Sequence, residues 1–422
     1  MTRLNFRPAE AAFWDEGDLD REYRRQLDVC HTCRLCFNLC PAFPDFFTRI
    51  DAVDGQMSRL NQADLDAFTD LCFECKLCDL KCPYVPPHEF NIEIPRLVLR
   101  ARAVHVRRHG VRFGDRMLGD TDRLGQMGAR TAGLANFGNS NPVSRFFIEK
   151  LIGVDRRRLS PRFNSPTFAQ WLKKNKPAPP AAPAAKAVLF YSCLVNYNDP
   201  SIGRALCAIL SHNNVELTAP DQKCCGMPAM DGGDMKAAVS KAQYNVSQLA
   251  PLVDRGYDVI VPSPTCGYVL KKEYPDLVGT TEAEKLSSHT FDVSEFLLRL
   301  KREGKLDSDF KAPPGEVAYH LPCHYKAQRI GNRYAELLRG AGARVKVVDK
   351  GCSGIDGTWG MKKDHYQMSN EVAEHMLEEF SAASDAVACT DCLLAGLQIT
   401  QGTGRTVKHP LHLLASAYGL EF

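Results

Sequence analysis

The chain has 422 residues, of which 44 % are hydrophobic, and its formal net charge at neutral pH is +3. This length allows two or three domains with buried cores, and the near-balanced charge argues against a protein that binds nucleic acid along its whole surface. No run of about eighteen apolar residues occurs and the N-terminal stretch lacks the apolar segment of a secretory signal, so we expect a cytoplasmic protein without a membrane-spanning helix.

The sequence contains 17 cysteines, most of them in tight groups. A reducing compartment keeps thiols free, so a disulfide framework is not expected in a chain without an export signal. Metal ligation is the better explanation for such groups.

Two stretches near the N-terminus repeat one dense cysteine pattern. Each has the spacing C-x2-C-x2-C-x3-C followed by proline, in the sets Cys30, Cys33, Cys36, Cys40 and Cys72, Cys75, Cys78, Cys82. A zinc ribbon instead needs two C-x2-C pairs separated by a longer loop. The spacing is that of bacterial ferredoxins, in which three cysteines of each run bind one [4Fe-4S] cluster and the fourth binds the other cluster. We therefore predict cluster 1 on Cys30, Cys33, Cys36 and Cys82, and cluster 2 on Cys72, Cys75, Cys78 and Cys40.

The segment between the two runs, residues 44–70, has apolar residues at helical spacing, which predicts a helical module rather than a small β-hairpin ferredoxin. Two basic amphipathic helices follow. The first begins near Pro95, and the second carries an apolar stripe of Val143, Phe147, Leu151 and Val154 beside residues 156–158, all arginine. These helices either pack on the protein with their arginines in water, which is the favoured interpretation, or lie on an anionic membrane or a partner.

Residues 173–186 are rich in proline and alanine and predict an extended linker. Beyond it, short apolar runs alternate with helical patterns, which indicates parallel α/β layers. Predicted strands cover 187–193, 215–220, 257–266, 316–323, 344–349 and 385–392, and predicted helices cover 201–213, 234–253, 332–342 and 366–380. The predicted organisation is a ferredoxin domain (1–106), a basic helical connection (107–172), the linker (173–186) and two repeats (187–312 and 313–422).

The two repeats place cysteines at corresponding points, at or near the predicted carboxyl ends of strands. The first has Cys193, Cys224, Cys225 and Cys266, and the second has Cys323, Cys352, Cys389 and Cys392. Such strand ends meet at one rim of a parallel sheet, where three or four thiolates would suit an iron–sulfur cluster or zinc. The alternative is that these cysteines are buried and inert. This alternative is stronger for the second repeat than for the first, and it is our interpretation of Cys207.

Histidines flank the first cysteine of the second repeat, at His320 and His324. Either could bind metal or move protons, with His324 the better candidate, but most histidines at strand ends only hydrogen-bond a carbonyl. Lys326 and Asp391 lie near the same rim and receive no predicted role.

Paired ferredoxin runs followed by two C…CCG…C repeats resemble the family of the iron–sulfur subunit of anaerobic glycerol-3-phosphate dehydrogenase, and the related heterodisulfide reductases and glycolate oxidase iron–sulfur proteins. The stretches that carry the resemblance include "CRLCFNLCPAF", "KCCGMPA", "SPTCGYVLKKEYP", "YHLPCH" and "SGIDGTWGMKKDHY". The resemblance covers nearly the whole chain. It implies a flavin-containing dehydrogenase as electron donor at the inner face of a membrane, and a quinone as acceptor.

Complete repeats in heterodisulfide reductase hold a non-cubane cluster through five cysteines, and this sequence departs from that pattern. Ser263 replaces one cysteine of the first repeat, Ser353 interrupts the CCG motif of the second, and Ala395 stands where its last cysteine is expected. The first repeat retains enough thiolates for an ordinary [4Fe-4S] cluster. The second could hold a cluster, a zinc ion or nothing.

No dinucleotide fingerprint, P-loop or flavin site is evident, so the chain needs a partner to supply electrons. Our leading prediction is an iron–sulfur electron-transfer subunit of a multi-protein oxidoreductase, working between a flavoprotein dehydrogenase or reduced carrier and a quinone. The alternative is a self-sufficient heterodisulfide or quinone reductase with catalysis at a cluster of a CCG repeat. A redox sensor is a third class, which no DNA-binding motif supports.

Overall fold

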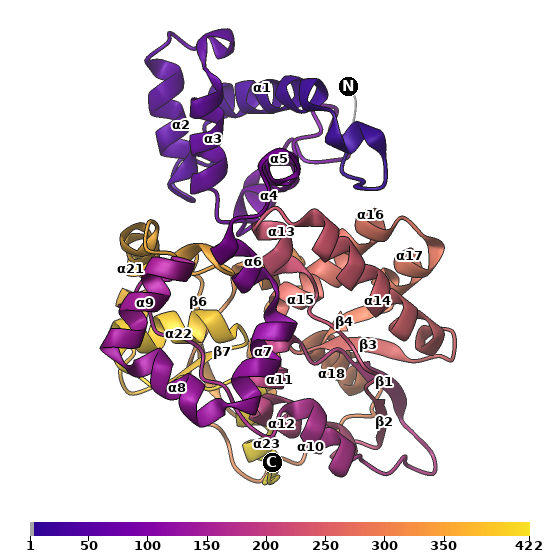
Figure 1. Cartoon of the computed structure of the whole chain (residues 1–422). Helices are drawn as coiled ribbons and strands as arrows, with labels where there is room; N and C mark the ends of the chain where they lie inside the picture. Colours follow the sequence, from indigo (N-terminus) through magenta and orange to yellow (C-terminus); the bar gives the residue numbers. More distant parts are fainter. Residues whose placement is uncertain (1–3) are drawn as a thin grey trace.

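The computed structural model describes residues 4–422, so residues 1–3 of the predicted N-terminal domain lie outside the described residues. Figure 1 shows a helical N-terminal module, a row of short helices along one side, and a body that contains two small sheets. The predicted fold class, a helical ferredoxin-like module followed by two α/β repeats, is confirmed.

The N-terminal module is entirely helical in its regular elements. They are η1 (Ala11–Trp14), α1 (Glu16–Cys33), α2 (Ala42–Asp51), η2 (Met57–Arg59), α3 (Gln62–Leu71), α4 (Leu77–Lys81) and α5 (Ile94–His109). Local sequence explains their starts, because Asp15 caps α1 and Asn61 forms a capping box with Asp64 at α3. Buried phenylalanines of α2 and α3, such as Phe46 and Phe68, pack edge to face and hold the module together. The predicted helical insert is therefore confirmed.

A row of short helices connects this module to the body. They are α6 (Phe113–Gly119), α7 (Thr121–Arg130), α8 (Ala132–Ser140), α9 (Pro142–Ile152) and α10 (Phe168–Lys174). Close packing of α7 depends on glycine, since a Cβ at Gly125 would lie 2.2 Å from the Tyr197 ring and one at Gly128 would lie 2.5 Å from the Phe163 ring. The Gly125 contact holds the middle of α7 against Tyr197 of the first repeat.

The first repeat has a parallel sheet with strand order β2-β1-β3-β4. Its elements are β1 (Ala185–Leu189), α11 (Cys193–Tyr197), α12 (Pro200–His212), β2 (Val215–Thr218), α13 (Met227–Asp231), α14 (Met235–Val253), β3 (Asp258–Val261), α15 (Pro264–Tyr268), η3 (Val269–Glu273), α16 (Tyr274–Val278), α17 (Thr281–Ser288), β4 (Thr290–Asp292) and α18 (Val293–Arg302). Strand β1 begins inside the stretch that we predicted as linker.

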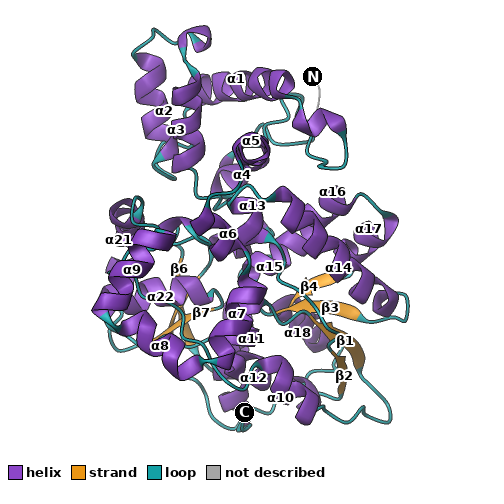
Figure 2. Ribbon diagram, viewed as in Figure 1, coloured by secondary structure: helices purple, strands orange, loops and turns teal. Residues whose placement is uncertain are grey.

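The second repeat has the shorter parallel order β6-β5-β7. Its elements are β5 (Glu316–His320), α19 (Cys323–Ala327), α20 (Arg333–Gly340), β6 (Arg344–Val348), η4 (Trp359–Met361), α21 (Tyr366–Ala382), β7 (Val387–Thr390), α22 (Leu393–Thr403) and α23 (Pro410–Tyr418). The order 6-5-7 matches the order 2-1-3 of the first repeat, and Figure 2 shows both sheets surrounded by helices. The predicted internal repeat is confirmed.

The predicted strands exist but are shorter than their apolar runs, and this changes where the cysteines lie. Cys193 and Cys323 are the first residues of helices α11 and α19, and Cys266 lies within α15. The prediction that these cysteines end strands is wrong. The Ser192 hydroxyl caps α11, and Pro322 stands at the N-cap position of α19, so Cys193 and Cys323 are carried on short helices that follow the strands.

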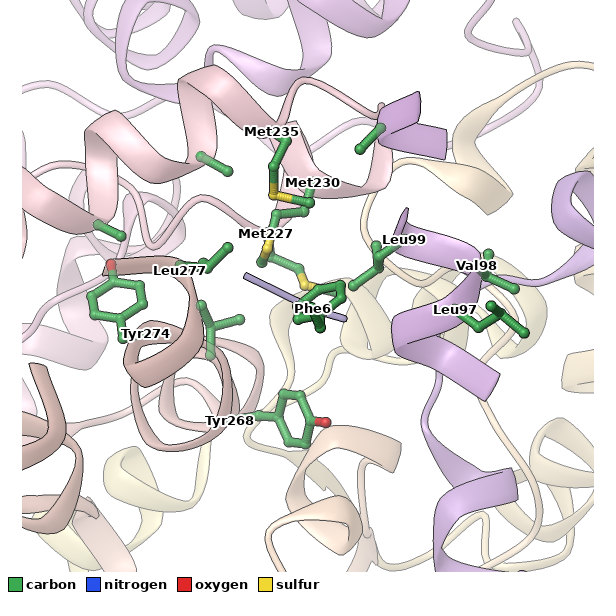
Figure 3. Close-up of a cluster of buried hydrophobic side chains, with 14 of the residues drawn as sticks. Phe6, Leu97, Val98, Leu99, Met227, Met230, Met235, Tyr268, Tyr274 and Leu277 are labelled. Carbon is green, nitrogen blue, oxygen red and sulfur yellow. The ribbon is translucent and has the colours of Figure 1, made fainter. Parts of the chain in front are cut away.

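Helix α5 joins the N-terminal module to the first repeat. Figure 3 shows Leu97, Val98 and Leu99 of α5 in the same buried cluster as the methionines of α13 and α14. Met227 and Met230 are at most 1 % exposed. Because methionine fills irregular gaps, this cluster holds the two regions in one fixed arrangement.

Candidate iron–sulfur sites

The first candidate site gathers four thiols from both ferredoxin runs. Cys30 and Cys33 lie in the last turns of α1, Cys36 lies in the following turn, and Cys82 caps α4. All four line one cavity of about 20 Å³. Burial raises the pKa of the Cys36 thiol to about 12, and the neighbouring Cys82 adds to the shift. Thiols crowded in this way become thiolates when a cation neutralises them, which is what bound iron does.

The second candidate site is arranged in the same way, but it is more deeply buried. Cys72, Cys75, Cys78 and Cys40 line another cavity of about 20 Å³. Two non-glycine residues of the loop, Glu74 and Lys76, have left-handed backbone at φ 57° and 62°, which folds the chain back around the cavity. The structure thus brings the eight thiols together in the two sets of four that we predicted, each containing one cysteine from the other run.

The second site borders the second repeat directly. Cys75 and Cys352 belong to one buried cluster with Phe73 and Trp359. Burial raises the pKa of Cys75 well above its ordinary value, and Cys352 is the first of the charged neighbours that add to this shift. A thiol of the second repeat is therefore next to the predicted cluster 2.

The first repeat brings its four thiols into one network. Cys193, Cys224, Cys225 and Cys266 reach each other from α11, from the loop before α13, and from α15. Hydrogen bonds from Cys193 and Cys225 lower the pKa of Cys224 well below its ordinary value. Helix α7 closes the site, because Asp122 accepts a hydrogen bond of 2.9 Å from the backbone N–H of Cys224.

The second repeat brings together only two of its four predicted thiols. The sulfurs of Cys323 and Cys352 are 4.0 Å apart, and their hydrogen bond lowers the pKa of Cys352. Cys389 instead lies in strand β7 and packs in the hydrophobic core with Tyr319 and Tyr334. Cys392 is the N-cap residue of α22. Cys389 thus lies within the strand, whereas Cys392 lies beyond its end, at the start of the next helix.

The histidines of the second repeat make structural contacts. His324 shares hydrogen bonds of 2.9 Å with the Glu74 carbonyl oxygen and the Thr265 hydroxyl, and His320 lies 3.2 Å from the Thr390 hydroxyl. Burial lowers the pKa of both histidines to about 3, so both rings are neutral near pH 7. His324 therefore ties the ferredoxin loop to both repeats.

Asp391 and Lys326 of the second repeat, for which we predicted no role, each have a polar partner. Asp391 accepts a hydrogen bond of 2.7 Å from the Tyr319 hydroxyl, and Lys326 forms an ion pair of 2.7 Å with Asp349. Neither contact points to catalysis.

The two basic helices differ from each other. In α5, Arg96 pairs with Asp276 at 2.8 Å and Arg100 is fully buried with its guanidinium on Asp18, so these arginines are not in water as we expected. In α9, Val143, Phe147 and Leu151 are exposed. Val154, the last residue of the predicted stripe, is buried. Among residues 4–422, no helix combines the length and apolar character needed to cross a bilayer.

Sequence reasoning missed several residues around the candidate clusters. Lys76 and Glu74 form a buried ion pair beside Cys75, and the Lys76 ammonium lies 5.8 Å from the Tyr268 ring centre. Trp359 packs on Phe73 with ring centres 5.0 Å apart. For the pair of Lys76 and Glu74, the only signal in the sequence was the presence of charged residues inside a cysteine motif. No signal indicated the pair of Trp359 and Phe73, because these residues are far apart in the chain.

Comparison with known families agrees with this architecture. Residues 23–108 match the model of the citrate utilization protein B Fer4-like domain, and residues 187–271 and 317–398 match the model of the cysteine-rich CCG domain. These matches cover both candidate ferredoxin sites and both repeats.

Several known proteins are similar in sequence. One subunit of anaerobic glycerol-3-phosphate dehydrogenase, from Escherichia coli K12, is 30 % identical over 402 residues, which cover 93 % of this chain and 98 % of the relative. Lactate utilization protein A of Geobacillus thermodenitrificans is 29 % identical over 49 % of this chain and 87 % of its own length. One subunit of the CoM/CoB fumarate reductase of Methanothermobacter marburgensis is 32 % identical over 39 % of this chain and 28 % of its own length. The chain is thus an iron–sulfur protein and belongs to the family of this anaerobic glycerol-3-phosphate dehydrogenase subunit.

Proposed function

We propose that the chain is the iron–sulfur electron-transfer subunit of an oxidoreductase, and that it passes single electrons from a flavoprotein dehydrogenase to a quinone or similar acceptor. The observation that carries this proposal is the grouping of eight cysteines into two neighbouring sets of four. Each set suits one [4Fe-4S] cluster. The family relationship supports a flavoprotein donor, since the relative is a subunit of a dehydrogenase.

The exposure of the two sites indicates which of them a donor protein can reach. Cys33 of site 1 is exposed, and the adjoining Leu35 and Phe37 are 45 % and 57 % exposed. Cys72 and Cys75 of site 2 are buried. A partner protein can reach cluster 1 at this apolar edge, and electrons then pass inward to cluster 2.

The first repeat supports a third cluster on Cys193, Cys224, Cys225 and Cys266, because these thiols already form one network. This observation also favours the second candidate function, a reductase with catalysis at that cluster. The thiol pair of Cys323 and Cys352 has too few partners for a complete cluster in the arrangement described.

We further propose that α8 and α9 rest on an anionic membrane surface. Leu134 and Phe137 of α8 and Leu151 of α9 are 74 %, 61 % and 68 % exposed. Basic side chains adjoin them, with the Lys150 ammonium 5.8 Å from the Phe146 ring centre and Arg156 also beside that ring. Exposed apolar residues flanked by basic ones are the pattern of helices that bind membrane surfaces. In Figure 1 both helices lie at the outer edge of the molecule.

Metal analysis of anaerobically purified protein tests the cluster content. About eight irons per chain with matching sulfide, and no zinc, would mean two clusters, and about twelve would add a cluster in the first repeat. The electron-transfer proposal then requires that the protein accept electrons from a copurifying flavoprotein. It fails if the fully loaded protein neither binds a flavoprotein nor is reduced by one. With only an artificial electron donor present, loss of quinone or disulfide reduction in Cys225→Ala would favour the self-sufficient reductase, because its catalysis takes place at the cluster of the first repeat.

A further inference from the structure

A cavity of about 580 Å³ lies where the N-terminal module meets the body. Helices α1, α3 and α5 form one wall, and α6, the end of α13 and the segment around η4 form the other. Figure 1 shows α1, α3 and α5 above α6. Its volume is within the range of small-molecule sites, which often occur where domains meet. None of the cysteines described above lines it.

The inner end of the cavity adjoins predicted cluster 2. Thr69 and Asp70 line it, and α3 then leads directly into Cys72. Arg102, also in the lining, donates a hydrogen bond of 2.9 Å to the Thr69 carbonyl oxygen. Trp359 continues the wall, and its ring packs at 5.0 Å on Phe73, which shares a buried cluster with Cys75. Two aromatic rings thus join the cavity to a cluster ligand, so a ligand here would be next to a one-electron carrier.

The inner end also offers a proton donor. The His365 ring stacks on Trp359 with centres 4.3 Å apart. One ring nitrogen lies 3.1 Å from an Asp70 carboxylate oxygen, and the other lies 3.3 Å from the Trp359 carbonyl oxygen. Both His365 and Asp70 line the cavity, and a histidine paired with a carboxylate is a group that can pass a proton to a ligand there.

The outer end carries polar groups of a second kind. The ring centres of His105 and His109 are 4.6 Å apart, and these residues lie about one and two helical turns beyond Arg102 on α5, so the cavity runs about 10 Å outward along this helix. Leu19, Leu65 and Val104 add apolar side chains to the lining. The lining thus combines hydrogen-bonding groups with apolar side chains.

The charges of the lining argue against a polyanion such as a nucleotide. Every lysine or arginine of the lining in residues 4–422 already has a partner, in the contacts Arg102–Thr69, Arg108–Glu16, Arg112–Asp115 and Lys362–Asp115. An anion would have to compete with a carboxylate for Arg108, Arg112 and Lys362, and with the Thr69 carbonyl oxygen for Arg102. A neutral, flat molecule with an oxygen at each end needs no free cation and fits the lining better.

We propose that this cavity binds the headgroup of a quinone and is the place where the chain reduces it. The inference rests on the proposed function for the identity of the electron source and adds the site itself. The reduction takes two electrons, which the donor of the proposed function would supply one at a time once the clusters are in place, and two protons, which come from His365 and from water at the His105 end. Both carbonyl groups of the quinone become hydroxyl groups, so the ligand leaves as the quinol.

The position of the cavity mouth supports a ligand with an apolar tail. Arg112 belongs to the lining, and the next residue, Phe113, begins α6 and is 64 % exposed. Helix α6 packs on α9, whose exposed apolar residues form the proposed membrane face. A tail that leaves the cavity beside Phe113 therefore continues onto the apolar surface.

The test uses the full chain with its clusters loaded and menadione as the quinone. The protein is first reduced by dithionite, and the excess dithionite is removed before menadione is added, because dithionite itself reduces menadione. His365→Gln keeps a hydrogen-bonding side chain but removes the proton donor, so menadiol formation should fall about 100-fold while binding of a fluorescent hydroxyquinoline N-oxide is unchanged. His105→Trp places a large ring in the lining and should weaken that binding. The control is His375→Gln, because His375 is 81 % exposed on α21, outside the cavity. Iron content checks that each variant is intact.

An azido-naphthoquinone gives a second, independent measurement, since light attaches it to the residues that it touches. Labelled peptides from α3, α5 or residues 359–365 would support the site, and labelling elsewhere would overturn it. If wild-type protein with reduced clusters forms no menadiol, the quinone part of the proposed function fails. If wild type is active and both cavity variants match it, the function stands and the location is wrong.

Discussion

Lys76 and Glu74 form an ion pair beside Cys75 that is closed to water, with side chains 0 % and 1 % exposed. Charged residues are rarely buried this completely unless they are paired. The pair lies where the ferredoxin loop, Tyr268 of the first repeat and His324 of the second repeat meet. The ion pair therefore lies in the contact between the N-terminal module and both repeats.

Lys76→Met should destabilise the protein strongly, because it leaves the Glu74 carboxylate buried without its partner. The expected loss is about 3–5 kcal/mol, measured as a lower midpoint of urea unfolding. The double variant Glu74→Gln with Lys76→Met removes both charges and should recover most of the loss. Equal destabilisation in the single and double variants would contradict this role of the pair.

The exchange of cysteines between the two runs can be tested by comparing spectra. Cys82→Ser should disturb the same electron paramagnetic resonance signal as Cys30→Ser, although Cys82 belongs to the second run. Cys40→Ser should likewise resemble Cys72→Ser. If Cys82→Ser instead resembles Cys72→Ser, each run holds its own cluster and our assignment is wrong.

The first repeat should lose metal when its thiol network is broken. Cys225→Ala is expected to reduce the iron content by about four atoms per chain, with the remaining signals unchanged. Cys207→Ala and Cys389→Ala are matched controls, because both thiols are buried in the hydrophobic core. An unchanged iron content in Cys225→Ala would mean that the repeat holds no cluster.

Stability should decrease in acid partly because of His409. Burial lowers the pKa of this histidine to about 3, whereas an unfolded histidine titrates near about 6.5. Between these values the unfolded chain binds more protons, so stability rises with pH from about 3 to 6.5 and is lost as pH falls through this window, by up to about 1.4 kcal/mol per pH unit.

His409→Asn isolates this contribution. The His409 ring caps α23 by accepting the backbone N–H of Leu411, and asparagine is a good substitute at such a position. The variant should show a smaller dependence of unfolding on pH in that window. His375→Asn, at an exposed position, should leave the dependence unchanged, and an unchanged slope in His409→Asn would contradict the assignment.

Binding to vesicles tests the membrane face on α8 and α9. Wild type should bind vesicles that contain anionic phospholipid at low salt and be released by high salt. The double variant Phe147→Glu with Leu151→Glu should bind at least about tenfold more weakly, since two apolar side chains no longer enter the lipid. Phe422→Glu is a matched control, because Phe422 is also exposed but lies at the C-terminus. Equal binding by all three proteins would exclude this face.

Features that depend on neighbours in the chain could be predicted from the sequence. The cysteine runs have a fixed spacing, and the repeated strands have continuous apolar residues, so both were recognisable. The same reasoning failed at Cys266, because the run 257–266 does not show that Pro264 starts a helix. Strand β4 was missed because its three residues are too few to form a pattern.

Contacts between segments that are far apart in the sequence could not be predicted from local sequence patterns. Cys352 is 277 positions after Cys75 in the numbering, yet both pack in one cluster, and only the docking of whole modules brings them together. Arg96 and Arg100 looked like a solvated basic face, but acidic partners from α16 and α1 made burial favourable. Without an alignment, the sequence contains no signal for such pairs.

The short helix α4 has a mechanical consequence for the electron path. Cys78 of site 2 lies in α4, and Cys82 of site 1 caps it, four residues later. One turn of helix therefore acts as a fixed spacer between the two centres, and helical hydrogen bonds make this spacer stiff. The long connection between the two runs contributes nothing to that spacing. Its length can change during evolution, or be changed by design, while the distance that an electron crosses between the two sites stays the same.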